Sequence, residues 1–567
     1  MRELSELEVL IVDCQTTGAT PAHGVVLELG WCRVKPSRTE LEALQAYWVK
    51  LPPGEKVSSH VRRLTGFDER LQSSALEPEV VWGRLRESLA PPLPMPAAIH
   101  FARFEVTFLR DWAERFAAHE PFPVDAVCVH AIACRLYPQL PRRGLRALSG
   151  YLGHGLDLTR RALGHVEATA FVWRKLTEEL AARGVYTWDA LSSWLAAPAA
   201  QSSRSSKRCY PLPSARYRAL PDQAGVYRFL RSNGDVLYVG KAASLRKRVA
   251  SHFKASGSTE QALEMLTQTQ DIAVTLAPTA LEAALLENET IKALRPPYNV
   301  HLTGRDTRVW FSTPGFDAEA TMPDAACRLG PLPAAYCLRP LGALLALCSG
   351  EPVTRRLKAR AVGAAELWAP DDAVFEAGFS EFRQRHLTEA TSEASASVRR
   401  KVFAAAKKLL LLSSSAQKPE APDAAEAEED TDAAAEGGWD PARVTRHLER
   451  AAAQAYRLLR RARWLCLLQD SAVVYWEPGS ERARVLWVTA GALLEAQDLA
   501  QAPVESGPPR TRPLSARQAS FDRAQYDRLR VLTSELKRVL RDGGSVSLDL
   551  ARRRFSGAAL ARMLCWV

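Results

Sequence analysis

An acidic, low-complexity segment at residues 418–440 limits what this chain can fold into. It is rich in Ala, Asp, Glu and Pro and has no aromatic residue before Trp439. Such a segment buries too little apolar surface to offset the entropy lost on folding, so we predict that it is disordered. A second segment, residues 198–208, is small, polar and basic, and we expect an exposed linker there. The chain must therefore fold as separate units.

The length of the chain supports the same division, because 567 residues are too many for one hydrophobic core. Alternating strand-like and helix-like stretches predict a multidomain α/β protein. We expect these segments in order: an α/β unit at 1–185, a linker at 198–212, a small α/β unit at 213–305, a mainly helical segment at 306–412, an acidic linker at 413–440, and a mixed α/β, Arg-rich region of unknown role at 441–567.

Local periodicity predicts particular elements within these units. Expected strands lie at 9–13, 25–29, 472–476 and 485–488. Expected helices lie at 79–89, 106–118, 397–411, 441–468 and 524–541.

The net charge of +11 and the pI of about 9.2 fit a polyanionic partner such as DNA, although a solvated Arg-rich surface gives the same balance. The sequence has no run of 18 consecutive apolar residues, so it predicts no membrane span. Residues 1–13 lack the basic region and cleavage signature of a signal peptide. The ten cysteines are scattered without a CxxC pair, so we expect reduced thiols in a cytoplasmic protein.

A tight hairpin is predicted in the second α/β unit. Two alternating runs, 225–230 and 236–239, flank the sequence SNGD, whose Asn-Gly pair favours a two-residue turn. Tyr227 and Tyr238 then fall on paired strands. Gly240 is expected to allow a sharp exit from the second strand.

A basic helix follows the hairpin, and Arg248 and His252 are four residues apart on one of its faces. A later helix presents Glu287, and a PPYN segment ending at Asn299 terminates it. Taken singly, a strand tyrosine is more often packing, and a helix glutamate or an Arg run is more often a solvated surface. Nucleic-acid contacts are expected at Arg246, Lys247 and Arg248.

This ordered string resembles the GIY-YIG nuclease family, and within it the nuclease module of the UvrC excinuclease subunit and its shorter relative Cho. GVY and YVG stand for the two motif halves, LRKRV for the Arg helix, and LLENETIK with RPPYN for the Glu-to-Asn segment. A single tripeptide would be a weak signal, whereas the ordered set is specific. The resemblance implies metal-dependent hydrolysis of a DNA phosphodiester.

The family implies a role for each matched residue. Glu287 would ligate a single Mg²⁺ or Mn²⁺, a hard ion that keeps most of its waters. Tyr238 would be the general base, with nearby Lys241 and the metal both lowering its pKa, and Arg248 would hold the scissile phosphate. The other catalytic positions are Tyr227, which would position water or phosphate, His252, where UvrC usually has tyrosine, and Asn299, which would complete the pocket.

The first unit resembles DnaQ-type 3′–5′ exonucleases, which have an RNase H-like fold, over about residues 8–175. The similarity lies in IVDCQTTG, HFARFEVTFL and RRALGHVEAT. The exonuclease site is degenerate at these segments. Its five positions are Asp13, which is retained, Gln15 and Glu105, which replace acidic residues, Arg160 in place of the general-base histidine, and His165 in place of the last aspartate.

These substitutions predict that the exonuclease fold is kept and its activity is absent. Two dications about 4 Å apart need several carboxylates, and Gln15, Arg160 and His165 remove negative charge. Glu167 could substitute for the last acid, but it leaves Gln15 and Arg160 unexplained. The unit could then bind a partner or a DNA end, or support its neighbour.

Residues 329–350 resemble the stretch that follows the nuclease module in UvrC, where the family continues into a four-cysteine iron–sulfur segment. Here Cys327, Cys337 and Cys348 are widely spaced, so we expect no iron–sulfur cluster.

The last region, 441–567, shows no RNase H-like set of carboxylates, and its first helix is crowded with arginines. One interpretation is a solvated helix with three leucines packed inward, and the other is a DNA or protein contact. The arginines are Arg443, Arg446, Arg450, Arg457, Arg460, Arg461 and Arg463, and the leucines are Leu458, Leu459 and Leu465.

The resemblance implies a bacterial endonuclease that nicks one strand of damaged or distorted DNA in nucleotide excision repair. UvrA and UvrB are the expected partners besides DNA, and the expected location is the cytoplasm, on the nucleoid when acting. Two alternatives stay open: a structure-specific endonuclease for branched DNA outside excision repair, and a non-catalytic DNA-binding scaffold.

Overall fold

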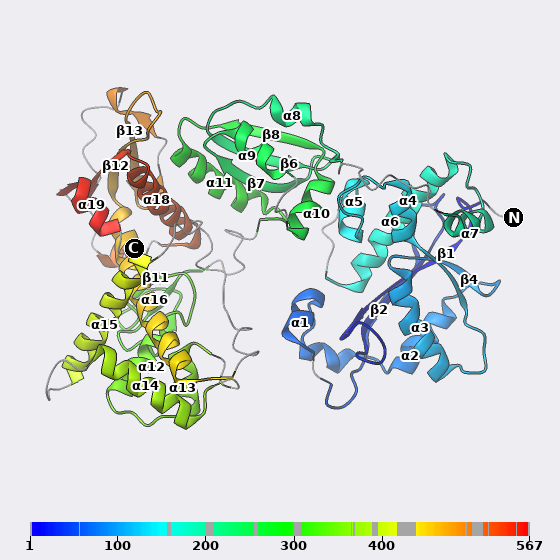
Figure 1. Cartoon of the computed structure of the whole chain (residues 1–567), viewed down its shortest axis with the longest axis horizontal. Helices are drawn as coiled ribbons and strands as arrows, with labels where there is room; N and C mark the ends of the chain where they lie inside the picture. Colours follow the sequence, from blue (N-terminus) through cyan, green and yellow to red (C-terminus); the bar gives the residue numbers. More distant parts are fainter. Residues whose placement is uncertain are drawn as a thin grey trace.

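The computed structural model of the chain places three groups of elements side by side (Figure 1). The middle unit, which contains the predicted hairpin, lies between the N-terminal unit and the C-terminal elements. The structure describes residues 3–155, 160–198, 209–254, 259–299, 308–387, 395–416, 438–501, 514–564 and 567, except positions 56, 365, 367, 368, 494, 495, 520, 551 and 552.

The N-terminal unit is built on a five-stranded mixed sheet of order β3-β2-β1-β4-β5. β1 (Val9–Thr16), β2 (Val26–Val34) and β3 (Glu42–Trp48) pair antiparallel, whereas β4 (Met95–Ile99) and β5 (Val124–Cys128) continue the sheet in parallel from β1. The near-complete burial of β1 fits a strand covered on both faces. This arrangement confirms the expected fold class for the unit.

Helices cover both faces of this sheet. α6 (Ala162–Ala181) packs on the face that holds Val9 and Ile11, and α2 (Pro78–Glu87) and α3 (Ala102–Phe116) pack on the other face. The unit also continues past residue 185, because α7 (Trp188–Ala196) buries a leucine in the same core. Trp188, Trp194 and Leu195 lie three or four residues from this leucine, so they share its face and pack on the same core.

The middle unit is an antiparallel sheet of order β7-β6-β8, formed by β6 (Gly225–Leu230), β7 (Val236–Ala242) and β8 (Asp271–Leu276). The predicted hairpin is therefore present. The covering helices are α9 (Leu245–His252), α10 (Glu260–Gln268) and α11 (Ala280–Leu294). Tyr227 faces the core shared with α9 and α10, whereas Val239 packs against α11 on the opposite face.

The expected strand exit at Gly240 is wrong, because β7 continues through this residue and pairs it with Tyr227. A Cβ atom on Gly240 would lie 2.5 Å from both Cζ and Oη of Tyr227. The glycine therefore makes room for a buried phenol ring, and it does not serve a turn.

A small sheet and a helical bundle follow. The sheet has the order β10-β9-β11, and the helices pack around the long α16 (Pro441–Leu468). The strands are β9 (Trp310–Ser312), β10 (Glu319–Ala320) and β11 (Leu329–Leu332). The helices are α12 (Arg339–Cys348), α13 (Arg355–Val362), α14 (Asp372–His386) and α15 (Ser395–Ala416).

Most of the two expected linkers lies outside the described residues, at 199–208 and 417–437. At the end of the first linker, Leu212 is buried in the core of the middle unit. Beyond the second, Asp440 caps α16.

The C-terminal unit is an antiparallel sheet of order β14-β13-β12-β16-β17, with β15 paired to β13. Its strands are β12 (Ser471–Trp476), β13 (Arg484–Thr489), β14 (Ala492–Leu493), β15 (Gln497–Asp498), β16 (Ser545–Leu550) and β17 (Arg553–Ser556). Its helices are α17 (Leu514–Ala519), α18 (Arg523–Arg541) and α19 (Gly557–Leu564).

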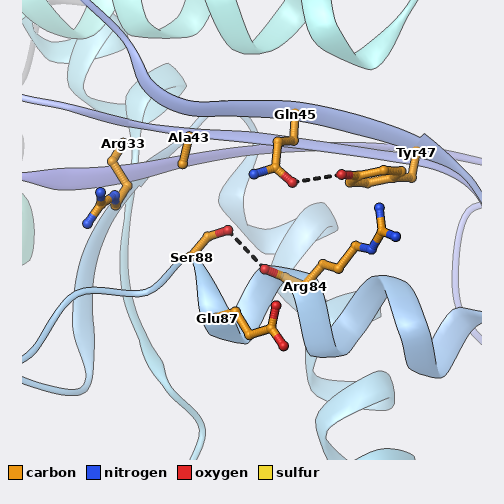
Figure 2. Close-up of a pocket in the computed structure, with 7 residues that line it drawn as sticks. All are labelled: Arg33, Ala43, Gln45, Tyr47, Arg84, Glu87 and Ser88. Atoms are coloured by element: carbon orange, nitrogen blue, oxygen red, sulfur yellow. Dashed lines mark hydrogen bonds between the residues drawn. The ribbon is translucent and has the colours of Figure 1, made fainter.

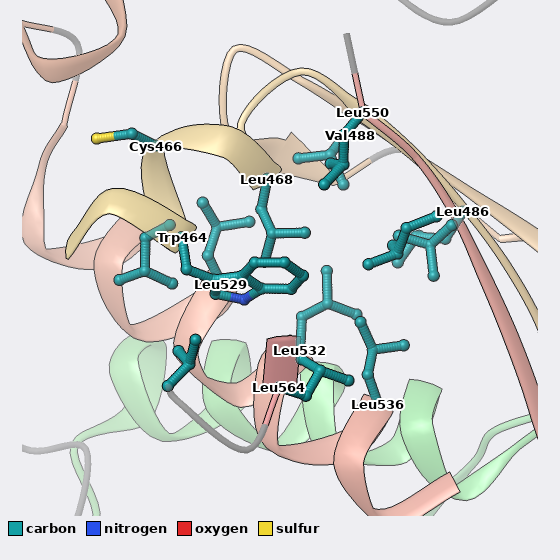
Figure 3. Packing of buried hydrophobic residues seen from close by; sticks show 14 of the residues in the cluster. Trp464, Cys466, Leu468, Leu486, Val488, Leu529, Leu532, Leu536, Leu550 and Leu564 are labelled. Carbon is teal, nitrogen blue, oxygen red and sulfur yellow. The ribbon is translucent and has the colours of Figure 1, made fainter. Parts of the chain in front are cut away.

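The core of this unit joins the end of α16 to α18 and the sheet, as the contacts of Trp464 and Leu468 with Leu529 and Leu532 illustrate (Figure 3). Leu458 and Leu465 of α16 are buried and Leu459 is partly buried, so the inward packing expected of these leucines is present.

Helix α11 belongs to two cores. Leu281 and Leu285 lie in the core of the C-terminal unit, whereas Ile291 packs against Val226 and Val239 of the middle sheet. The helix therefore joins the two units through opposite faces.

Within the described part of the chain, no helix is long and apolar enough to cross a membrane. The nine cysteines described there are free thiols.

Candidate functional site

Arg248, His252 and Tyr238 lie around a buried phenol, that of Tyr227. Its hydroxyl lies 2.7 Å from Nε2 of His252, and the side chain is fully buried. Arg248, one turn before His252 on α9, hydrogen-bonds to the same phenol oxygen. The expected shared face of Arg248 and His252 is therefore directed at Tyr227.

Electrostatics keep Tyr227 and His252 neutral. Burial, with the neighbouring Tyr238, raises the pKa of Tyr227 well above its usual range, although Arg248 acts in the opposite direction. Burial, with the positive charge of Arg248, lowers the pKa of His252 to about 4. The neutral phenol and the neutral imidazole share one hydrogen bond, whose donor is set by the imidazole tautomer, and Arg248 donates to the phenol oxygen.

Tyr238 is the more accessible of the two phenols, because its side chain is only half-buried. It pairs with Phe229 across the hairpin, and their rings stack with centroids 6.0 Å apart. Its ring centroid is also 6.0 Å from that of Tyr227. Part of Tyr238 is therefore open to solvent, whereas Tyr227 is enclosed.

The carboxylate of Glu287 is tied to the end of β7. The backbone N–H of Lys241 donates to Oε1 of Glu287 over 2.8 Å. Asn299 holds the same strand, because its amide exchanges two hydrogen bonds of 2.9 Å with the backbone N–H and C=O of Val239. Asn299 therefore fixes the backbone on which Tyr238 and Lys241 stand.

The side chain of Lys241 leaves β7 on the face opposite to Tyr238, since the two residues are three apart on a strand. Its Nζ lies 2.5 Å from Oε1 of Glu535 on α18. This placement corrects the expectation that the charge of Lys241 lies beside the phenol of Tyr238.

The three basic residues expected to contact nucleic acid differ in their surroundings. Arg246 and Lys247 are exposed and lie 2.9 Å and 3.8 Å from the carboxylate of Asp222. Arg248 is also exposed, and it is the one that reaches the buried phenol.

Sequence reasoning missed Glu535, which is 294 residues away from Lys241. Local periodicity cannot indicate a partner at such a separation. The available signal was an acidic residue among the leucines of the amphipathic helix 524–541, which suits burial only when it is paired.

The five positions expected to form a degenerate exonuclease site also come together. The Cys14 N–H donates to Oε2 of Glu105 over 2.7 Å, next to Asp13 on β1. Nδ1 of His165 lies 3.2 Å from Oδ2 of Asp13. The amide of Gln15 donates to the backbone carbonyl of Arg160.

The charges at this second site are largely neutralised internally. Burial and the nearby Asp13 raise the pKa of the Glu105 carboxyl well above its usual range. For His165, burial acts to lower the pKa, but the charge and hydrogen bond of Asp13 outweigh it and the pKa is raised. Glu167 lies two residues beyond His165, about 200° further round α6, so it does not share the face that meets Asp13.

No group of three or more His, Cys, Asp or Glu side chains that could hold a metal ion occurs among the residues that the structure describes. A pocket of about 410 Å³ in the N-terminal unit lies elsewhere, between the β2–β3 edge and α2 (Figure 2). It is lined by Arg33, Gln45, Tyr47 and Arg84 among others, so it is separate from the five degenerate positions.

The family model for the UvrC-like GIY-YIG domain matches residues 223–300, which include Tyr227, Tyr238, Glu287 and Asn299. This stretch is a UvrC-like GIY-YIG domain. The UvrABC system protein C of Alkalilimnicola ehrlichii is 50% identical over 98 residues, which cover 17% of this chain and 16% of that protein.

A protein of Mycobacterium tuberculosis, named as a bifunctional exonuclease/endonuclease, is 28% identical over 305 residues, or 52% of this chain and 45% of that protein. The chain thus spans less than half the length of either curated relative. The region that precedes the GIY-YIG domain is exonuclease-like.

Among solved structures, the magnesium-bound GIY-YIG N-terminal endonuclease domain of UvrC from Thermotoga maritima is 30% identical. The match covers 15% of this chain and 93% of the Thermotoga maritima domain, with a TM-score of 0.14.

The depressed pKa of His252 predicts a pH-dependent loss of stability in the GIY-YIG domain. As pH falls, the unfolded chain protonates His252 near pH 6.5 and the folded chain only near pH 4, so stability is lost between these values. Between about pH 7 and about pH 5, the wild type should lose about 2 kcal/mol more unfolding free energy than a His252→Gln variant. Denaturant unfolding measures this difference. A His119→Gln variant, at an exposed histidine, is the control and should lose as much unfolding free energy as the wild type. Equal losses of unfolding free energy in the wild type, His252→Gln and His119→Gln would contradict the burial of a neutral His252.

Proposed function

We propose that this chain is a metal-dependent endonuclease that nicks one strand of damaged or distorted DNA in nucleotide excision repair, with the GIY-YIG domain as its working site. The main support for this proposal is that Tyr238, Arg248 and the anchored carboxylate of Glu287 lie within one UvrC-like domain. The net charge of +11 suits a DNA substrate.

The carboxylate of Glu287 is a suitable ligand for a hard divalent ion. This carboxylate is held at one oxygen by the Lys241 N–H, which fixes the orientation of the group. Mg²⁺ and Mn²⁺ accept one protein carboxylate and fill their other positions with water and phosphate oxygens. An ion held there would supply positive charge to the phosphoryl oxygens of the substrate.

The phenols have different tasks in this proposal. Tyr238 takes the proton from the attacking water, because it is the accessible phenol next to the Glu287 end of β7. Tyr227 is unsuited to that role, since its pKa is raised, its side chain is fully buried and its hydroxyl is bonded to His252. It holds Arg248 instead, whose guanidinium then meets the scissile phosphate.

Asn299 supports the same chemistry indirectly. By holding the backbone of Val239 it fixes the strand that presents Tyr238, so that the phenol keeps a constant position relative to Glu287.

The place of the reaction in the cell is also a proposal. Resemblance to UvrC suggests that UvrA and UvrB bring the enzyme to damaged DNA in the bacterial cytoplasm, on the nucleoid.

Comparing the nicking of lesion-bearing and branched duplexes distinguishes this role from that of a structure-specific endonuclease outside excision repair. An absence of nicking on either duplex would favour a DNA-binding scaffold.

We further propose that the exonuclease-like region is inactive. Asp13 faces the imidazole of His165, and Glu105 is buried with a raised pKa, so little negative charge is left to hold two dications. Arg160 stands where the resemblance requires a base, and guanidinium cannot accept a proton at working pH.

Replacing Glu287 by Gln should abolish nicking of a lesion-bearing duplex with Mg²⁺, because the amide keeps the shape and removes the charge that binds the ion. Supercoiled-plasmid or labelled-duplex nicking measures the rate. Glu289→Gln, two residues along the same helix at an exposed ion pair with Arg528, is the matched control and should nick at the wild-type rate. Wild-type nicking by the Glu287→Gln chain would refute the assignment.

The full chain carrying Glu287→Gln should release no mononucleotides from a 3′-labelled single strand with Mg²⁺ or Mn²⁺. Using this background excludes products of the GIY-YIG site from the measurement. Release of mononucleotides that disappears on adding Asp13→Ala would show that the exonuclease site works.

A further inference from the structure

The helix that carries Glu287 is packed against the C-terminal unit, and α18 lies along it (Figure 1). Leu281 is fully buried and Leu285 nearly so in the core of that unit, the cluster of Figure 3. The position of α11 therefore depends on residues more than 150 positions further along the chain.

Charged groups of the C-terminal unit also bind the first turn of α11. The carboxylate of Glu477 accepts the backbone N–H groups of Ala280 and Leu281 at 3.2 Å and 2.9 Å. Arg538 of α18 donates to Glu477 over 2.8 Å and to Glu535 over 2.6 Å. An anion at a helix N-terminus is stabilised by the exposed N–H groups there.

Glu535 connects this network to the nuclease site. Glu535 is 3% exposed, and its carboxylate lies 2.5 Å from Nζ of Lys241. The backbone N–H of the same lysine donates to Glu287. Lys241 thus links the two units: its ammonium is bound by α18, and its backbone N–H is bonded to the carboxylate proposed to bind the metal.

We propose that Glu535 is a positioning residue of the nuclease site and that it acts through Lys241. The inference rests on the proposed function of the GIY-YIG domain. A buried carboxylate is stable only when it is paired with good geometry, so Glu535 holds the ammonium of Lys241 in one place. Holding that side chain fixes the end of β7, and with it the N–H that orients Glu287 and the strand that presents Tyr238.

The same interface contains a matched ion pair that does not reach the site. Asp527 of α18 is 2% exposed and lies 2.8 Å from Nζ of Lys292 on α11. Like Glu535, it also binds an arginine of its own helix, Arg523 at 3.2 Å. Loss of either acid weakens the interface, but only the loss of Glu535 releases Lys241.

The test compares Glu535→Gln and Asp527→Asn in the full chain, in steady-state nicking of a lesion-bearing duplex with Mg²⁺. We expect Glu535→Gln to lower kcat by roughly tenfold to a hundredfold, as displaced catalytic groups do, with KM within about twofold of the wild type. Asp527→Asn should stay within about twofold in both constants. Thermal unfolding should shift similarly in the two variants, which separates positioning from stability.

A double-mutant cycle tests the route of the effect. In a Lys241→Met background, whose residual rate is measured first, Glu535→Gln should cause no further loss of kcat. Equal kcat losses in Glu535→Gln and Asp527→Asn, or full additivity with Lys241→Met, would overturn the proposal. If Glu535→Gln does not fold, Glu535→Asp replaces it, and wild-type kcat in that variant overturns the proposal as well.

The outcome is separable from that of the proposed function. A wild-type chain that fails to nick refutes the nuclease assignment itself. A wild-type chain that nicks, beside a Glu535→Gln chain with unchanged kcat, refutes only the role of Glu535.

Discussion

Burial of α11 on two opposite faces is the constraint on which the nuclease site depends. Ile291 packs on the middle sheet and Leu281 in the C-terminal core, and complete burial of one aliphatic side chain contributes about 1.5–3 kcal/mol. A helix held in this way cannot rotate or slide without exposing apolar surface on one side. Its Glu287 is therefore kept against the Lys241 N–H at the end of β7.

The exonuclease-like unit supports the GIY-YIG domain from another side. Its helix α5 (Leu145–Tyr151) packs against α10, and Gln270 donates to the carbonyl of Tyr151 over 2.8 Å. A Cβ on Gly150 would lie 1.9 Å from Oε1 of Gln268, so the two surfaces meet closely. A unit with these contacts has a structural reason to persist even without chemistry of its own.

Elements and motif residues could be predicted from the sequence because they depend on local pattern. Alternation and the Asn-Gly turn predicted the strands of Tyr227 and Tyr238, and helical spacing predicted that Arg248 and His252 share a face. Gly240 was misinterpreted because a glycine that makes room for a ring looks the same in sequence as one that allows a turn.

The direction of Lys241 and its pairing with Glu535 could not be predicted, because they arise from the docking of two units distant in sequence. The same limit applies to Leu281 and Leu285. Their apolar character predicted burial, but no local pattern indicates that the covering core is built mainly from residues 464–567.

The proposed function requires one working metal site, at Glu287. The number of Mn²⁺ ions bound by the full chain, counted by titration with electron paramagnetic resonance detection, tests this requirement. One ion is expected for the wild type and for Asp13→Asn, and none for Glu287→Gln. Two ions in the wild type, one of them lost in Asp13→Asn, or undiminished binding in Glu287→Gln, would contradict it.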